Sequence, residues 1–370
     1  MIRVGINARA LAKPNPAGVS RYTYNLIEAL ATETRVNTDF EYLLFGVESL
    51  PSDLLEYDRI QSADVYPPSH SGLHAHRWEQ LALPRALRHH DIDVFHTPAG
   101  QPPILSGLSR VPVVTTIHDI SPVVHPEWFS CGYATLYRIL TPLAVLASAR
   151  VIGVSEFVRN EIIDTYPNAA TKTVTIHNGV TPPADPGTPI EPLTAGEFLL
   201  FIGAGNRRKN LQTLLSAYRQ YWTRADNPSQ LALAGPERNV FADLEYEPPA
   251  GVHALGYVPD DQLGWLYRNA TAFVFPSLYE GFGLPIVEAM HAGTPVITSN
   301  QGAMAEIAGN AAHLVDPLDT AHLVKAIERI LSEKSYREHL AEQGQERAAS
   351  FIWERAAAQT VDVYRAVTKQ

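Results

Sequence analysis

Short apolar runs alternate along this chain with segments whose apolar residues recur at the helical period. This alternation is typical of parallel α/β units, in which each strand is followed by a helix. In the first half, the expected strands lie in IRVGIN, FEYLLFG, DVFHT, VVTTIH, VIGVS and TVTIH. After residue 197 the pattern restarts with FLLFIGAG, LALAG, VHALGY, AFVFPS, TPVITS and HLVD. We therefore expect an α/β protein with two tandem, Rossmann-like, doubly wound domains.

The run TPPADPGTPIEPLTAGE separates the two halves at residues 181–197 and is rich in Pro, Gly and Thr. Because it has no usable periodicity, we interpret it as a linker between domains at residues 1–180 and 198–350. The chain of 370 residues is long enough for two such cores. Residues 351–370 are predicted to form a C-terminal amphipathic helix that crosses back to the first domain.

Composition narrows the class of protein and its compartment. The net charge of −10 disfavours a general nucleic-acid-binding protein. The single cysteine, Cys131, is typical of a reduced, intracellular protein, and no apolar run reaches the roughly 18 residues of a membrane span. We expect a cytoplasmic protein with a peripheral contact at the inner face of the membrane. The segment HAHRWEQLALPRALRHH, read as an amphipathic surface helix broken or kinked at Pro84, is a candidate for contact with the membrane or with the acceptor through its Arg and Trp side chains.

Two glutamates, Glu280 and Glu288, are separated by seven residues in the stretch SLYEGFGLPIVEAM. A buried strand ends just before it, and Pro285 suits the first turn of a helix. This arrangement places Glu280 in the strand-to-helix loop and Glu288 in the first turn of the helix. Gly281 and Gly283 allow the backbone to approach a ligand closely. A ligand with hydroxyls on both sides of an anionic bridge, such as a nucleotide sugar, fits this layout. The simpler alternative is that the glutamate only stabilises the start of the helix and binds no ligand.

A second candidate site lies in FIGAGNRRKN, where a strand leads to Gly203 and Gly205 and then to Arg207, Arg208 and Lys209. Three cations that open a helix favour the binding of a phosphate group. A dinucleotide-binding fingerprint is the weaker match, because an arginine stands where its third glycine belongs. Arg208 at that position also argues against an NAD-dependent oxidoreductase. The remaining alternative is a solvated basic helix start.

The order of the motifs resembles that of the retaining glycosyltransferases of family 4. The matching segments are RYTYNL, RWEQLALP, TIHDISPVVHPEWF, VIGVSEF, HNGV, RRKN, FVFPSLYEGFGLPIVEAM and the tryptophan of FIWERAA. The chain is similar in detail to the subgroup of mannosyltransferases of O-antigen polymannan assembly. The resemblance implies a GT-B fold with two domains facing a cleft, a nucleotide-sugar donor and retention at the anomeric carbon. Asn206-Arg207 and His177 depart from the residues that are usual in the family.

The resemblance also implies roles for residues of the second domain. Arg208 and Lys209 would hold the donor diphosphate and stabilise it as it leaves. Glu280 would orient the hydroxyls of the sugar, and Glu288 would bind the ribose. Further donor-binding residues are Gly203, Phe282, Gly283 and Leu284, the last three through their backbone amides.

In the first domain, His118 and Asp119 directly follow a buried strand. The resemblance implies that His118 contacts the donor sugar, whereas position alone favours a loop histidine. Gly18 ends the loop KPNPAG, which in the family closes over the cleft; a plain flexible loop is the alternative. Asn178-Gly179 is foremost a turn signal.

The resemblance implies a retaining glycosyltransferase that moves a hexose from a nucleotide sugar to a glycan or lipid-linked saccharide in cell-surface polysaccharide synthesis, and likeness to the subgroup alone favours GDP-mannose as the donor. No cofactor and no metal are expected. The residues Asp91–Asp93 are interpreted as a strand start, and the histidines at 70, 74, 76, 89 and 90 lack the partners of a closed metal site. The alternatives are a UDP- or GDP-glucose donor, a nucleotide-sugar 2-epimerase, and a non-enzymatic carbohydrate-binding adaptor.

Overall fold

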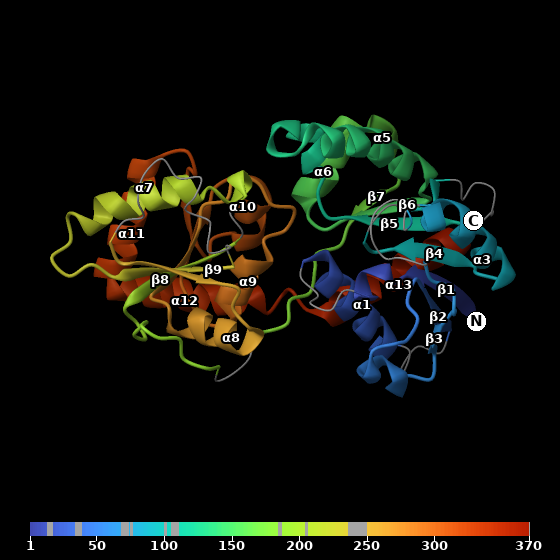
Figure 1. Ribbon diagram of the computed structural model, residues 1–370, viewed down its shortest axis with the longest axis horizontal. Coiled ribbons are helices and arrows are strands. Elements are labelled where there is room, and N and C mark those ends of the chain that lie inside the picture. Colours follow the sequence, from blue (N-terminus) through green and yellow to red (C-terminus); the bar gives the residue numbers. More distant parts are fainter. Residues whose placement is uncertain are drawn as a thin grey trace. The chain divides into compact units, whose positions relative to one another are not determined.

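The computed structural model describes residues 1–12, 18–33, 39–67, 74, 77–99, 102–104, 111–183, 187–203, 206–235 and 250–369. The chain divides into two compact units, one of Met1–Gly179 with Ile352–Gln370 and the other of Val180–Phe351. Each unit is built around one parallel sheet with helices packed on it (Figure 1). The predicted α/β class with two doubly wound domains is therefore confirmed.

The sheet of the first unit has seven parallel strands in the order β3-β2-β1-β4-β5-β6-β7. The strands are β1 (Ile2–Asn7), β2 (Phe40–Phe45), β3 (Ile60–Ser62), β4 (Val94–Thr97), β5 (Val113–Ile117), β6 (Arg150–Gly153) and β7 (Thr173–Thr175). All but the three-residue β3 lie, to within one residue, in the apolar runs identified in the sequence. The order reverses direction between β1 and β4, which is the position at which doubly wound sheets bind ligands.

Helices and helical turns of the first unit connect these strands. Their bounds are η1 (Arg9–Ala12), α1 (Val19–Glu33), η2 (Ser52–Glu56), η3 (Trp78–Ala82), α3 (Leu83–His89), α4 (Ser121–Val124), η5 (Pro126–Trp128), α5 (Cys131–Ala147), α6 (Glu156–Thr165), η6 (Pro167–Ala169) and α13 (Trp353–Thr368). The C-terminal α13 lies beside α1 in Figure 1 and packs against it. Its residues Ala357, Val361 and Tyr364 join the core under the sheet. The helix predicted to cross back to the first domain does so.

The segment predicted as an amphipathic surface helix differs from that expectation. It forms the π-helical turn η3 and then α3, with Pro84 in the first turn of α3. The indole of Trp78 is only 6% exposed, because it packs in a cluster with Phe45 and Phe95. The proposed membrane contact through this tryptophan is therefore wrong. In the part of the chain that the structure describes, no helix is long and apolar enough to cross a bilayer.

The second unit has a six-stranded parallel sheet in the order β10-β9-β8-β11-β12-β13. The strands are β8 (Phe198–Ile202), β9 (Gln230–Ala234), β10 (Val252–Gly256), β11 (Ala272–Phe275), β12 (Val296–Ser299) and β13 (His313–Val315). Each lies, to within one residue, in one of the apolar runs identified in the second half of the sequence. The order reverses direction between β8 and β11, so this pair of strands marks the expected ligand-binding edge.

The helices of the second unit are η7 (Arg207–Lys209), α7 (Leu211–Trp222), α8 (Asp260–Asn269), α9 (Leu284–His291), α10 (Gly302–Ala308), α11 (Thr320–Ser332) and α12 (Lys334–Ala348). The segment expected to be a linker belongs to this unit. Part of it packs on α8, where Thr188 bonds Asp261 and the guanidinium of Arg268 donates to the carbonyl of Pro183 at 2.7 Å.

Candidate active site

The carboxyl ends of β8 and β11 bring the two sequence motifs of the second unit together. The strands are direct neighbours in the sheet, with Leu199 opposite Ala272 and Leu200 opposite Phe273. The basic motif follows β8, and the glutamate-glycine motif follows β11. Both loops therefore leave the sheet at the same edge, at the point where the strand order reverses.

Lys209 and Glu280 form a buried ion pair between these two loops. The amine Nζ of Lys209 lies 2.7 Å from Oε1 of Glu280, and the two side chains are 14% and 10% exposed. The hydroxyl of Ser277 donates to the same oxygen at 3.0 Å, and the amine lies 4.6 Å above the ring of Phe275. Among the described residues, both polar contacts of this carboxylate are thus made by Oε1, which leaves Oε2 for a ligand hydroxyl.

The basic motif forms a 3-10 turn, in contrast to the expected helix start. The side chain of Asn206 accepts a hydrogen bond from the amide of Arg208 at 3.1 Å and caps the turn. The carbonyl of Arg208 accepts from the amide of Leu278 at 2.7 Å, which ties this turn to the loop after β11. The α-helix begins only at Leu211, so the three cations precede it.

Asn210 ends the turn and anchors it. Its φ of 58° is left-handed, a conformation that asparagine tolerates better than most residues. Its side-chain amide donates to the carbonyl of Pro276 at 3.0 Å and to that of Pro317 at 2.7 Å. This buried residue was part of the RRKN motif, but the sequence did not show that it joins three loops.

The glycines and backbone amides predicted to bind the donor lie around this pair. A Cβ atom on Gly203 would lie 3.3 Å from Cγ and Cδ of Lys209, so the glycine leaves room for the stem of the lysine side chain. Gly283 has a φ of 98° and precedes α9, whose first residue is Leu284. The ring of Phe282 is buried against Phe351, with centroids 5.6 Å apart.

Glu288 lies on α9 and receives a hydrogen bond from Tyr267. The phenol oxygen lies 2.7 Å from Oε2 of the glutamate. Since α9 begins at Leu284, Glu288 lies one residue past the first turn in which it was predicted. Tyr267 comes from α8 and was not identified as a site residue, because no local pattern connects it with the glutamate motif.

In the first unit, His118 follows β5 and is held from two sides. Its Nε2 lies 2.8 Å from the carbonyl oxygen of Pro98, and its ring meets the edge of Tyr22 at 4.6 Å between centroids. Because a carbonyl oxygen only accepts, Nε2 carries the hydrogen and Nδ1 of the neutral ring is an acceptor. Burial lowers the pKa of His118, although the Pro98 bond and the charge of Asp119 oppose this effect.

A series of buried hydrogen-bonded side chains leads from α13 to Tyr22, whose ring contacts His118. The hydroxyl of Tyr364 on α13 lies 2.6 Å from Nδ1 of His96, and Nε2 of His96 lies 2.9 Å from the hydroxyl of Thr116. Thr116 in turn bonds the phenol of Tyr22, whose pKa burial raises to about 12. Burial, with a smaller effect of the nearby His118, lowers the pKa of His96 to about 3. The sequence did not reveal this series, because its members lie on four elements.

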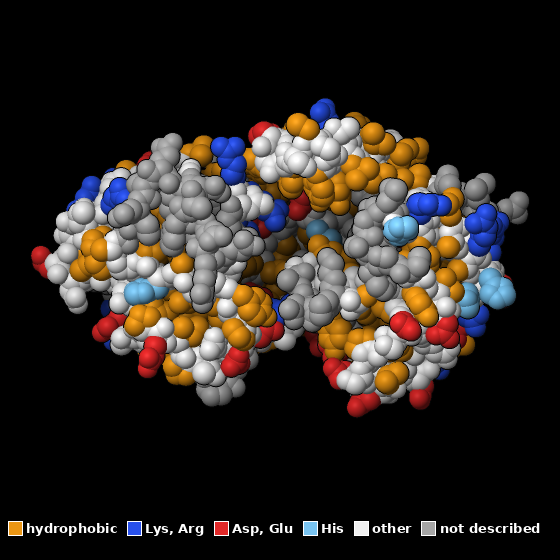
Figure 2. Space-filling model, in the orientation of Figure 1, with side chains coloured by type: hydrophobic (Ala, Val, Ile, Leu, Met, Phe, Trp, Pro, Cys, Tyr) orange, Lys and Arg blue, Asp and Glu red, His pale blue; other side chains and the backbone are white. Residues whose placement is uncertain are grey.

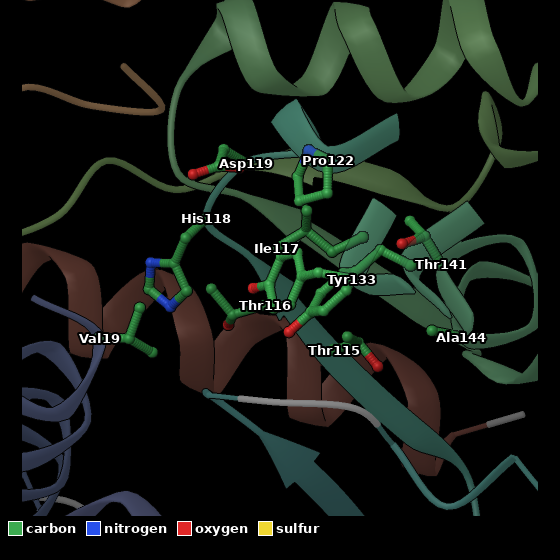
Figure 3. Close-up of a pocket in the computed structure, with 11 residues that line it drawn as sticks. Val19, Thr115, Thr116, Ile117, His118, Asp119, Pro122, Tyr133, Thr141 and Ala144 are labelled. Atoms are coloured by element: carbon green, nitrogen blue, oxygen red, sulfur yellow. The ribbon is translucent and has the colours of Figure 1, made fainter. Parts of the chain in front are cut away.

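A pocket of about 190 Å³ opens beside His118 (Figure 3). His118 and Val19 lie on one side of it in the picture, and Thr141 and Ala144 of α5 lie on the other. Gly18, with a φ of 54°, directly precedes Val19 at the start of α1. The pocket therefore joins the predicted histidine, and the residue next to the predicted loop glycine, to a helix that was not identified as part of the site.

A further polar cluster lies at the end of β1, where the strand order of the first sheet reverses. The buried carboxylate of Glu79 accepts from the side-chain amide of Asn7 at 3.2 Å and from the guanidinium of Arg9 at 3.0 Å. Glu79 belongs to the π-helical turn η3, a local distortion that is frequent at functional sites. The RWEQLALP motif contains this glutamate, but the sequence did not show that it faces β1.

Of the ten residues predicted for the site, eight lie in the second unit, and Gly18 and His118 lie in the first. Gly205, His70 and His76 fall outside the described residues. Within the described residues, no three His, Cys, Asp or Glu side chains form a group that would hold a metal ion. Asp93 receives a hydrogen bond from the amide of Arg3 next to the start of β4.

Comparison with known proteins decides the family. Residues 16–182 match the family model described as Glycosyltransferase Family 4, and residues 191–347 match Glycosyl transferases group 1. The O-antigen chain mannosyltransferase B of Escherichia coli is 32% identical over 373 residues, which cover 94% of this chain and 96% of that protein. This chain is a family 4 glycosyltransferase. An O-antigen chain mannosyltransferase of Salmonella typhimurium is 30% identical over 221 residues, 58% of this chain and 60% of its own length.

Solved structures show that the family 4 enzyme has the GT-B fold. A sucrose-phosphate synthase from Thermosynechococcus elongatus superposes with a TM-score of 0.76 at 21% identity, covering 99% of each chain. The Anabaena protein HepE, solved in complex with UDP and glucose, has a TM-score of 0.69 at 18% identity and also covers 99% of each chain. At these identities the likeness concerns the fold alone.

The buried His96 and the partly buried His118 of this glycosyltransferase predict that its first unit is sensitive to acid. The folded-state pKa values of His96 and His118 are lowered from the usual value of about 6.5, so the unfolded chain takes up protons first as the pH falls. We expect the free energy of unfolding to decrease as the pH falls below about 6.5. For His96 the decrease approaches roughly 1.4 kcal/mol per pH unit and continues down to about pH 3, and His118 acts in the same direction. Urea unfolding at pH 7.5, 6.5 and 5.5 measures this slope.

The matched variant is His96→Gln, which removes one titrating group and keeps a polar side chain at the same place. Its stability is expected to be lower at pH 7.5 but to change less between pH 6.5 and 5.5 than that of the parent protein. An identical slope in the two proteins would show that His96 is not responsible.

Proposed function

We propose that this glycosyltransferase moves a mannosyl group from GDP-mannose to a glycan or lipid-linked saccharide in cell-surface polysaccharide synthesis, with retention and without a metal ion. The observation that carries the proposal is the buried Lys209–Glu280 pair at the ends of β8 and β11. A cation and a carboxylate at that edge suit a ligand that carries a diphosphate next to sugar hydroxyls. A mannosyl donor is favoured because two relatives of this chain are O-antigen chain mannosyltransferases.

The diphosphate is proposed to bind at the basic turn. Lys209 and Arg208 meet the negative charge that develops on the β-phosphate as the glycosidic bond breaks. The backbone amides of Gly283 and Leu284, at the start of α9, donate hydrogen bonds to the nucleotide sugar. Because Asn210 and the Arg208–Leu278 hydrogen bond hold the turn in place, little reorganisation is needed when charge develops.

The sugar and the ribose are proposed to bind the two glutamates. Oε2 of Glu280 accepts from a sugar hydroxyl, while Oε1 keeps Lys209 in position. Glu288, oriented by Tyr267, accepts from the ribose. His118 contributes to the same reaction through Nδ1, which accepts a hydrogen bond from the donor sugar because Nε2 is bonded to Pro98.

Retention is proposed to follow from attack on the leaving-group face of the donor. The acceptor hydroxyl forms the new bond to the anomeric carbon as the bond to the diphosphate breaks. A phosphate oxygen takes the proton of the acceptor hydroxyl. In this step the residues of the chain bind and orient, and the cations stabilise the leaving group.

The test is release of nucleoside diphosphate by the purified protein in the presence of EDTA, over a panel of GDP- and UDP-sugars. We expect slow release from GDP-mannose alone, and faster release when a mannan acceptor is added. Release from a UDP-sugar instead would show that the donor is not GDP-mannose, but it would still support a glycosyl transfer reaction. Formation of a free 2-epimer would show an epimerase, and donor binding without turnover would show an adaptor.

A further inference from the structure

Helix α5 presents an unusually apolar face to solvent. Residues Tyr133, Leu136, Ile139, Leu143 and Leu146 are between 37% and 64% exposed, and they follow one another at steps of three or four along the helix. At this spacing their side chains share one face. Figure 2 shows hydrophobic side chains gathered over α5. Contiguous exposed apolar surface of this kind marks an interaction site more often than scattered single residues do.

The charged side chain of α5 and two charged side chains near its carboxyl end are basic, although the whole chain has a net charge of −10 and the exposed Glu127 precedes the helix. No Asp or Glu occurs from Cys131 to Ala147, and Arg138 is the charged residue of the helix. Lys172 lies at the carboxyl end, where its amine donates to the carbonyls of Leu146 and Ser148 at 3.3 and 3.0 Å. Arg150 begins β6, three residues after the end of α5. The face therefore complements an anionic apolar surface.

The opposite face of α5 lines the pocket beside His118. Tyr137, Thr141 and Ala144 contribute to it, and Tyr133 takes part in both the pocket and the exposed face. An acceptor whose lipid stays in a bilayer under the exposed face would thus find the pocket on the other side of the same helix.

We propose that α5 seats the enzyme on an anionic membrane, with the apolar face at the boundary between headgroups and acyl chains. Amphipathic helices bind there through buried apolar area and through attraction between basic side chains and anionic lipids. A second copy of the chain is the weaker occupant. A helix of this length offers roughly 25 by 10 Å of surface, well below the ~800 Å² per partner of a stable interface. This inference goes beyond the proposed function and does not depend on the donor.

The test is co-sedimentation with vesicles of phosphatidylglycerol and phosphatidylethanolamine. The triple variant Leu136→Gln, Ile139→Gln, Leu143→Gln is expected to lose about tenfold or more in vesicle partitioning. The matched control is Leu55→Gln, Leu81→Gln, Leu318→Gln, which changes three exposed leucines elsewhere and should stay within twofold of the parent protein. Both variants should keep the thermal unfolding midpoint and the release of nucleoside diphosphate, which the vesicle assay does not need.

A second set of measurements tests whether basic side chains contribute to vesicle binding. Arg138→Gln, or vesicles of phosphatidylcholine alone, should weaken binding several-fold, and 1 M salt should do the same. Absence of vesicle binding by the parent protein, or equal binding by the α5 variant, would overturn the proposal. A parent protein that is dimeric by light scattering, with a monomeric α5 variant, would assign the face to a second copy instead.

Discussion

Lys209→Met is expected to reduce the release of nucleoside diphosphate by about 10²- to 10³-fold, which is the usual effect of removing one group that stabilises developing negative charge. The amine lies at the end of β8, 2.7 Å from Glu280, and methionine keeps the volume of the side chain without its charge. The donor assay under saturating nucleotide sugar measures the loss. Lys325→Met, which changes an exposed lysine on α11, is the control and should leave the rate unchanged.

The double variant Lys209→Met, Glu280→Gln separates a catalytic pair from a structural one. Removing one partner of a buried ion pair leaves the other charge uncompensated, at a cost of about 3–5 kcal/mol. If the pair only stabilises the fold, the double variant should recover both the unfolding midpoint and the activity. We expect it to recover stability and to remain inactive, because the diphosphate and the sugar each still lack a partner.

Gly179→Ala is expected to destabilise the first unit by about 1–3 kcal/mol, which lowers its unfolding midpoint by roughly 5 °C. A Cβ atom on Gly179 would lie 2.5 Å from Cα of Trp353, the first residue of α13, and backbone atoms cannot give way as a flexible side chain does. The start of α13 would have to move. Because Tyr364 of this helix bonds His96 and fills the core, the disturbance would spread into the sheet.

Gly132→Ala is the matched control. Gly132 is the second residue of α5, and nothing lies within 4 Å of the Cβ atom that the substitution would add. Alanine in a helix is more favourable than glycine by about 0.5–1 kcal/mol, so this variant should be as stable as the parent protein or slightly more so. Calorimetry of both variants measures the difference. Equal midpoints for them would contradict the close contact between Gly179 and Trp353.

Much of the site was predictable because its signals are local. The glutamate at 280 follows an apolar strand and precedes two glycines and Pro285, and these features predict a strand, a tight loop and a helix start that the structure contains. The basic residues at 208 and 209 follow another such strand. Since parallel strands of a doubly wound sheet present their carboxyl ends at one edge, the pattern also placed both motifs on that edge.

The errors arose where contacts with distant residues decided the outcome. Trp78 looked like a surface residue of an amphipathic helix, but Phe45 and Phe95 from two strands form a pocket that buries it. The basic motif was expected to open a helix, yet Asn210 adopts a left-handed conformation because the carbonyls of two other loops receive its side-chain amide. No pattern along the chain reports such a partner.

The sequence by itself determined the α/β class, the division into two sheets, the position of nearly every strand and the identity of the family, because hydrophobic periodicity and motif order are properties of neighbouring residues. Only the tertiary structure decided that Tyr267 orients Glu288, that the hydrogen bond to Pro98 sets the tautomer of His118, and that α5 has one face on a pocket and another in solvent. These features depend on the packing of elements that are far apart in the chain, and packing selects partners by shape and by unsatisfied polar groups rather than by sequence distance.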